Sequence, residues 1–261
     1  MQRYIWWIGG GLVVIAAVVL FFSWRSNHHK QVPVATGATS ATTAPAAPPA
    51  IQNPVPASSG ANQSLPSLQA SDQPLHDSLG ELIGRKAADA LFKPEQIIRH
   101  IVVTIDNLSR KRTAVELRPT KPLPGTFMVN GDEQHSTLDP ANYRRYAAIV
   151  QVARTVDTKQ VASLYFHYYP LFQQSYQDLG YPNGYFNDRL VATIDNLLAT
   201  PDITGDIVLV RPNVMYQFAD PNLEDLSAGQ KALVRMGPEN ATIVKNKLRE
   251  LRAEIAGAAA H

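Results

Sequence analysis

The chain has 261 residues, of which 45% are hydrophobic and 18% are charged, and its lack of cysteine excludes disulfides, thiol catalysis, cysteine-ligated zinc and lipid attachment at an N-terminal cysteine. The net charge of +2 is unevenly distributed along the chain. Positions 31 to 71 carry no charged residue, and the part from Asp77 onward carries 21 basic and 21 acidic side chains. A neutral folded part does not favour binding to nucleic acid, which needs basic residues gathered on the recognition domain.

Residues 4–24 are predicted to form a transmembrane helix, within an anchor segment of residues 1–30. The helix segment has no charged residue and is close to the roughly 20 residues that span a bilayer core. Aromatic residues at its two ends are predicted to lie at the membrane interfaces, namely Tyr4, Trp6, Trp7 and Trp24. The alternative is a cleaved signal peptide, which is disfavoured because the apolar run does not end at small residues.

The orientation of this helix is only weakly indicated. Arg3 precedes the helix and Arg25 and Lys30 follow it, so the positive-inside rule barely decides. The short head favours a cytoplasmic N-terminus, and the reversed topology, with the domain in the cytoplasm, remains an alternative.

Residues 31–76 are predicted to be a disordered linker. This segment holds eight of the 19 prolines among Ala, Thr, Ser, Gln and Asn, with few large apolar side chains to bury. Such a composition suits a spacer between a membrane and a folded domain.

Residues 77–256 are predicted to form a single, mainly α-helical domain with two small β-hairpins, followed by an Ala-rich tail at 257–261. Its helix-start signals are Ser78 with Glu81, Pro94, Asp139 with Pro140, Asp157 with Gln160, and Ser227 with Gln230. Pro170 lies inside a helical pattern and is predicted to kink or break that helix near Tyr169. The last helix is predicted to start at Glu239, after Gly237 and Pro238.

The two hairpins are indicated by strand-like segments next to turn residues. The first lies between Pro119 and Leu138, around the turn at Asn130 and Gly131. The second joins residues 207–210 to residues 214–218.

No catalytic motif is present, and we predict no catalytic residue, no metal site and no cofactor. The histidines do not form a zinc-protease pattern, and phosphate-binding, dinucleotide-binding and serine-hydrolase motifs are absent from the sequence. The alternative is a hydrolase with paired carboxylates such as Asp188, Asp195 or Asp220, whose spacing in space the sequence does not define.

Two features indicate a binding surface. Nine of the ten tyrosines lie between positions 143 and 216, where they could line a groove or be half-buried helix residues. Arg235, next to the start of the last helix, could bind an anion or could bridge to Asp220 or Glu224. The candidate binding patch is Tyr181, Asp188, Arg189, Asp220, Glu224, Arg235 and Asn240.

Several motifs together resemble a proteobacterial family known as domain of unknown function 3014. They include Asp139 to Tyr146, Leu179 to Pro182, Phe186 to Leu190, Phe218 to Glu224 and Gln230 to Pro238, and the resemblance covers roughly Leu75 to Ile255. The resemblance implies a single-pass protein of a Gram-negative inner membrane with its domain in the periplasm. It implies no activity and no catalytic residue.

The sequence thus predicts a membrane-anchored periplasmic protein that acts by binding or scaffolding in the cell envelope. Its expected partners are the lipid bilayer, through residues 4–24, and an envelope protein or a cell-wall component, with no nucleic acid. A periplasmic hydrolase using paired carboxylates is the alternative function.

Overall fold

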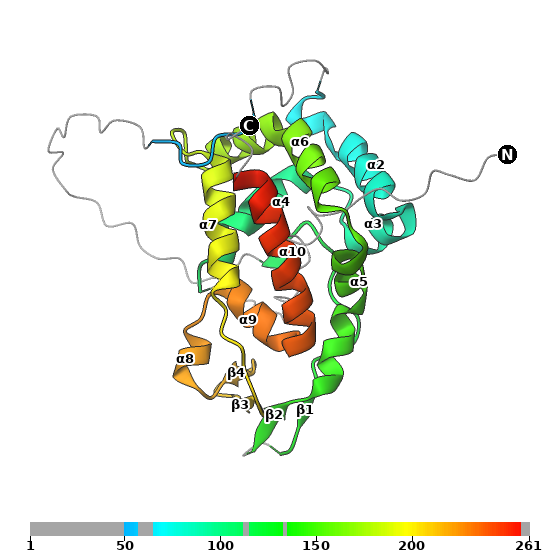
Figure 1. Ribbon diagram of the computed structural model, residues 1–261. Helices are drawn as coiled ribbons and strands as arrows, with labels where there is room; N and C mark the ends of the chain where they lie inside the picture. Colours follow the sequence, from blue (N-terminus) through cyan, green and yellow to red (C-terminus); the bar gives the residue numbers. More distant parts are fainter. Residues whose placement is uncertain (1–49, 57–64, 112–114, 133–134, 257–261) are drawn as a thin grey trace, which may run out of the picture.

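The computed structural model describes residues 50–56, 65–111, 115–132 and 135–256 (Figure 1). Among these residues, no helix is long and apolar enough to cross a membrane. The predicted anchor with Tyr4, Trp6, Trp7 and Trp24 lies outside the described residues, as do parts of the predicted linker and the tail at 257–261.

The described residues form a mainly helical fold with one small antiparallel sheet, which confirms the predicted helical class. Its elements in chain order are η2 (Leu68–Ala70), α2 (Asp72–Ile83), α3 (Arg85–Leu91), α4 (Ile97–Leu108), η3 (Val115–Leu117), β1 (Val129–Asn130), β2 (Ser136–Leu138), η4 (Pro140–Tyr146), α5 (Ala147–Thr155), α6 (Thr158–Asp178), α7 (Phe186–Leu198), β3 (Val208–Val210), β4 (Gln217–Phe218), α8 (Pro221–Glu224), α9 (Ala228–Arg235) and α10 (Pro238–Ala256).

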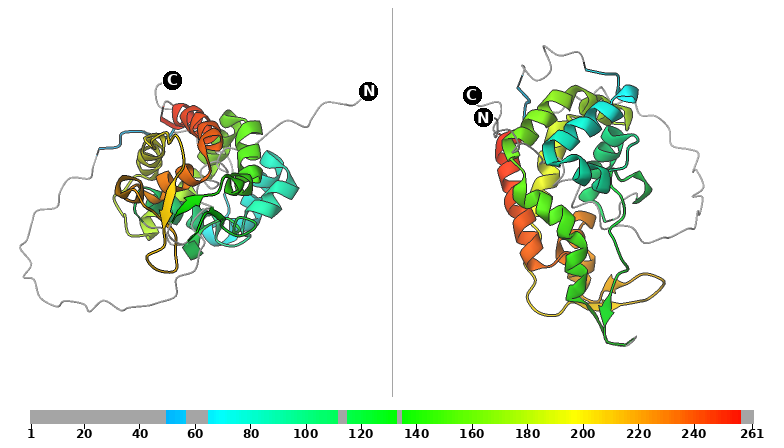
Figure 2. Two further views of the ribbon diagram at one scale, coloured as in Figure 1. Left: turned by 90° about the horizontal axis from the view of Figure 1, so that it is seen from below. Right: turned by 90° about the vertical axis from the view of Figure 1, so that its right-hand side faces the viewer.

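The core lies between three layers of helices. Helices α6, α7 and α9 contact α4 on one side and α10 on the other, and α10 also packs against α5 (Figures 1 and 2). Helix α4 is buried along most of its length, from Ile97 to Leu108, because neighbours cover it from several sides. Burying apolar side chains such as Ile98 and Ile105 supplies about 1.5 to 3 kcal/mol each, so this helix is central to stability.

The N-terminal boundary of the domain differs from the prediction. Helix α2 begins at Asp72, and Ser78 lies within it with its hydroxyl bonded to Pro74 O at 2.9 Å, so Ser78 is not a helix cap. Asp72 instead caps α4 across the fold, since its carboxylate accepts the backbone N–H groups of Gln96 at 2.7 Å and Ile97 at 2.8 Å. The sequence missed this because the capping residue lies 25 positions from the helix that it caps.

The predicted linker also contains ordered, docked chain. Residues 50–56 are hydrogen-bonded to the start of α7, and Val55, Leu65 and Leu68 pack against the main core. The boundary at residue 76 was therefore wrong for these residues, while residues 31–49 and 57–64 lie outside the described ranges.

Three other predicted helix starts are confirmed. Asp139 accepts the N–H of Ala141 at 2.7 Å, Asp157 accepts that of Lys159 at 2.8 Å, and Ser227 forms a reciprocal capping box with Gln230. These local signals were reliable because each side chain acts within three residues of itself.

Two further predictions differ in detail. Of the predicted kink or break near Tyr169, the break is wrong: α6 continues through Pro170 to Asp178 as one helix, which contacts both α4 and α10. The last helix begins at Pro238, one residue before Glu239, since proline suits a first helical position.

The two predicted hairpins form one four-stranded antiparallel sheet in the order β1-β2-β3-β4. Strand β2 joins them, because Thr137 pairs with Val208 of β3. Beneath the sheet, Leu138, Leu209 and Phe218 form a second apolar cluster with Val234 of α9. The sheet therefore lies at one end of the helical body and is fixed to it through α9 (Figure 1).

Candidate functional site

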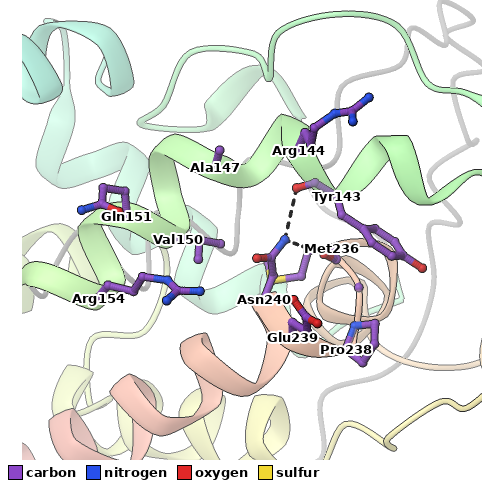
Figure 3. Close-up of a pocket in the computed structure, with 11 residues that line it drawn as sticks. Tyr143, Arg144, Ala147, Val150, Gln151, Arg154, Met236, Pro238, Glu239 and Asn240 are labelled. Atoms are coloured by element: carbon purple, nitrogen blue, oxygen red, sulfur yellow. Dashed lines mark hydrogen bonds between the residues drawn. The ribbon is translucent and has the colours of Figure 1, made fainter.

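An open groove lies between η4 and α5 on one side and the turn from α9 to α10 on the other. We call it the α5–α10 groove, and its cavity volume of about 580 Å³ is in the range of small-ligand sites. Its lining residues are Tyr143, Arg144, Ala147, Val150, Gln151, Arg154, Met236, Gly237, Pro238, Glu239 and Asn240 (Figure 3).

The two walls of the groove are held together by polar and steric contacts. The Asn240 side-chain amide donates to Tyr143 O at 3.1 Å and to Met236 O at 2.9 Å, which ties α10 to η4 (Figure 3). Gly237 has a φ of +87°, and its backbone lies so close to the Tyr143 ring that a Cβ there would be 2.7 Å from the ring carbons. Glycine is therefore required by both the backbone conformation and the close approach.

The groove has a positive bias. Arg144 and Arg154 are exposed, and within the described part of the chain neither side chain makes a hydrogen bond or ion pair. The first-turn N–H groups of α10, including those of Glu239 and Asn240, have no acceptor inside the helix and carry partial positive charge. Glu239 is the one negative side chain among the lining residues, so the groove offers two cations and one anion.

Arg154 and Arg144 point in different directions. Figure 3 shows the Arg154 side chain extending toward the first turn of α10, where Glu239 and Asn240 lie, and the Arg144 side chain pointing away from that turn. A ligand that spans the groove could therefore contact Arg154 at the helix start and Arg144 at the opposite end.

Arg235, predicted as an anion-binding residue, does not reach this groove or the surface. It is 7% exposed, and its guanidinium lies over the Phe218 ring, 4.5 Å from the ring centroid. Burial lowers its pKa to about 10, which still leaves it protonated at neutral pH. The sequence prediction was wrong because α9 is covered on all sides, an unusual setting for arginine.

The rest of the predicted patch is divided among separate places. Tyr181 and Arg189 meet at Asp106, where Arg189 Nε lies 3.1 Å from one carboxylate oxygen and Tyr181 donates at 3.3 Å to the other. Arg110 pairs with the same carboxylate at 2.7 Å. This arrangement, which we call the Asp106 cluster, joins α4 to α7 and to the loop before it.

Asp220 and Glu224 stabilise the turn between β4 and α8. Asp220 caps α8 by accepting the N–H of Asn222 at 2.8 Å, while Glu224 accepts the N–H of Phe218 at 3.0 Å and pairs with Lys231 at 2.9 Å. Because the partners of both carboxylates lie nearby in the chain, their role at this turn is structural.

Asp188 binds the docked segment at residues 52 and 53, and Asn240 alone of the predicted patch lines the α5–α10 groove. The seven predicted residues are thus not a single surface.

The carboxylates suggested for hydrolysis have separate partners. Asp188 accepts backbone N–H groups, Asp195 forms a two-point ion pair with Arg252 at 2.5 and 3.0 Å, and Asp220 caps α8. The described residues contain no group of three or more side chains that could hold a metal ion. This arrangement gives no support to the hydrolase alternative.

Arg144, Gln151 and Arg154 were not predicted as site residues. A spacing of ten residues places two side chains about 80° apart on a regular helix, so periodicity does not group the two arginines. Residues 140–146 form a 3-10 helix, which changes that angle. The groove forms because the turn at the start of α10, which is distant in sequence, faces these residues.

Residues 97–252 match the model of a family described as "Protein of unknown function (DUF3014)". The match extends from the start of α4 into the last turns of α10 and so includes both walls of the groove. Searches of the curated proteins and of the solved structures found no match.

Proposed function

Because the chain belongs to the DUF3014 family, whose description assigns no activity, we propose a function from its own groove. The protein is a binding module, not an enzyme, and the α5–α10 groove binds a peptide that carries carboxylate groups. One observation supports this most directly. The side chains of Arg144 and Arg154 line the groove and have no hydrogen-bond or ion-pair partner among the described residues, and the start of α10 forms the facing wall.

The chemistry of the groove favours a carboxylate over other ligands. A planar guanidinium donates two parallel hydrogen bonds to a carboxylate, and a helix start adds N–H donors and positive potential. Apolar side chains in the wall, Val150, Met236 and Pro238, can contact the body of a peptide. Glu239 adds a site for an amino group on the same ligand.

We further propose that residues 4–24 anchor the protein in the inner membrane and that the domain lies in the periplasm. The uncharged 21-residue apolar segment with aromatic ends supports the anchor. The ligand then comes from the cell envelope, either as the acidic peptides of the cell wall or as an acidic segment of an envelope protein.

The topology predicts the behaviour of reporter fusions to the C-terminus. Alkaline phosphatase fused after His261 should be active, because this enzyme needs the oxidising periplasm to form its disulfides. Deleting residues 1–30 from the same fusion should abolish phosphatase activity. An inactive fusion of the full chain, together with a fluorescent cytoplasmic reporter at the same position, would contradict a periplasmic domain.

The groove predicts charge-dependent binding. We expect purified cell-wall sacculi to co-sediment with the protein, and the double substitution R144E/R154E to weaken binding at least tenfold, which corresponds to about 1.4 kcal/mol. Reversing two charges replaces attraction with repulsion, so binding should also weaken as salt rises. Titration with soluble acidic peptides and with detergent-solubilised envelope proteins distinguishes the two ligand sources.

Arg99 provides the matched control. It is an exposed arginine on α4 that also makes no hydrogen bond or ion pair within the described residues, and it does not line the groove. R99E should bind as the wild type does. Equal loss in R99E and in R144E/R154E would indicate general attraction to a positive protein and would reject the groove as the site.

A further inference from the structure

A short extended segment, residues 51–55, lies against the first turn of α7, and we call it the strap. The Asp188 carboxylate accepts two successive backbone N–H groups, those of Gln52 at 3.1 Å and Asn53 at 2.7 Å. It also accepts the side-chain amide of Asn53 at 2.9 Å. Figure 1 shows this segment beside the end of α7 that is nearest to the C-terminus of α10.

Two neighbours of Asp188 complete the contact with the strap backbone. The Asn187 side chain donates to Asn53 O at 2.9 Å, and the Tyr185 hydroxyl accepts the N–H of Val55 at 2.8 Å. Three side chains of one short stretch thus bind both donors and acceptors of an extended main chain. Main-chain contacts of this kind are typical of sites that bind extended peptides.

The receiving groups are fixed by the core and not by the strap. Asn187 is fully buried, accepts from the Tyr165 hydroxyl at 3.0 Å and donates also to Ile255 O at 3.1 Å. Gln173 of α6 holds the loop before α7, through Gly184 O and the N–H of Phe186, both at 2.8 Å. None of these core contacts involves a strap residue.

The strap itself is weakly held. Ile51 is 54% exposed, Gln52 and Pro54 are exposed, and Val55 is only half-buried, so little apolar surface is covered. Each hydrogen bond adds little net stability, somewhat more where the acceptor is the Asp188 carboxylate, and ordering each residue of the strap carries an entropic cost. These opposing terms are close in size, which makes local release of the strap possible without unfolding the domain.

We propose that Tyr185, Asn187 and Asp188 form a peptide-binding site, separate from the α5–α10 groove, and that the strap is its intramolecular ligand. The site recognises an extended peptide through its main chain and through an asparagine side chain at the position of Asn53. A second peptide with the same features binds only when the strap is displaced.

Amide hydrogen exchange on the full-length protein tests this proposal. The amides of Gln52, Asn53 and Val55 should be protected, yet should exchange at least tenfold faster than those of α4, which open only with the whole domain. D188A should accelerate exchange at Gln52 and Asn53 at least tenfold and leave α4 unchanged. D178A is the matched control, because Asp178 is an exposed aspartate at the end of α6 that makes no hydrogen bond with the strap among the described residues.

Competition in the wild-type protein makes the test independent of any folding defect. A synthetic peptide of residues 50–56, added in excess, should speed exchange of the strap amides, and a peptide with alanine for Asn53, which lacks the side-chain contact with Asp188, should do so more weakly. If the strap and α4 amides exchange at one rate and the peptide has no effect, the strap is a permanent part of the fold and the proposal is wrong. Loss of sacculus binding by R144E/R154E is unaffected by either result, because that groove shares no residue with this site.

Discussion

Replacing Asp106 by alanine is expected to destabilise the domain by about 3 kcal/mol, near the lower limit for breaking a buried ion pair. The side chain of Asp106 is 6% exposed and is paired with both Arg110 and Arg189, whereas these arginines are 52% and 24% exposed. Removing the carboxylate leaves two positive charges at the junction of α4 and α7 with no anion between them. Partial solvation of Arg110 keeps the cost below that of a fully buried pair.

The loss can be measured by urea unfolding and by thermal unfolding of the full-length protein, both followed by circular dichroism. Tryptophan fluorescence is unsuitable because all three tryptophans lie within residues 1–24, outside the domain. For a domain of this size, a loss of 3 kcal/mol corresponds to a fall in Tm of roughly 6 to 12 °C. D225A is the control, since Asp225 pairs with Lys111 where both side chains are mostly exposed, and it should leave the Tm unchanged. A Tm for D106A equal to that of D225A would contradict a structural role for the Asp106 cluster.

The helices were predictable where their signals are local. Asp139, Asp157 and Ser227 each cap a helix within three residues, and the apolar spacing of α7 follows from residues inside that helix. Ser78 had the same local pattern but lies inside α2, because Asp72 starts that helix earlier. A capping pattern identifies a possible start, and tertiary packing decides which of two candidates is used.

The joining of the two hairpins was not predictable from either hairpin alone. Each hairpin is specified by its own turn, but Thr137 and Val208 pair across 71 positions of sequence. Leu138 of β2 and Leu209 of β3 bury their side chains in one apolar cluster with Val234 of α9, which favours this pairing. The apolar face of the sheet, and not the turns, determines that one sheet forms.

The site was predictable only in part, for a related reason. The sequence analysis drew attention to the start of α10, where Asn240 lines the α5–α10 groove, and it chose Arg235 as the cation. Arg235 instead lies over Phe218 inside the fold, and the Arg154 side chain of α5 extends toward the helix start. A charged residue next to a helix start in sequence need not face that start, because the preceding helix sets its direction.

Replacing Gly237 by alanine is expected to cost about 2 to 4 kcal/mol, through two separate effects. An L-residue at a φ of +87° costs about 1 kcal/mol or more. The added Cβ would also lie 2.7 Å from Cγ and Cδ2 of Tyr143, so the ring must move, at a cost of about 1 to 3 kcal/mol. Tyr143 lines the α5–α10 groove, so the same movement should weaken ligand binding in the groove.

Gly84 separates the two effects, because it has nearly the same φ, +86°, and an added Cβ there meets no atom within 4 Å. G84A should therefore show the backbone cost alone, measured by urea unfolding, and G237A should exceed it. In a double-mutant cycle, removing the ring in Y143A/G237A should recover the steric part of the stability that G237A loses. The double variant should therefore be destabilised by less than the sum of the two single variants. Equal losses in G84A and G237A would mean that Tyr143 accommodates the new methyl group at no cost, and the close contact between η4 and the start of α10 would not define the groove.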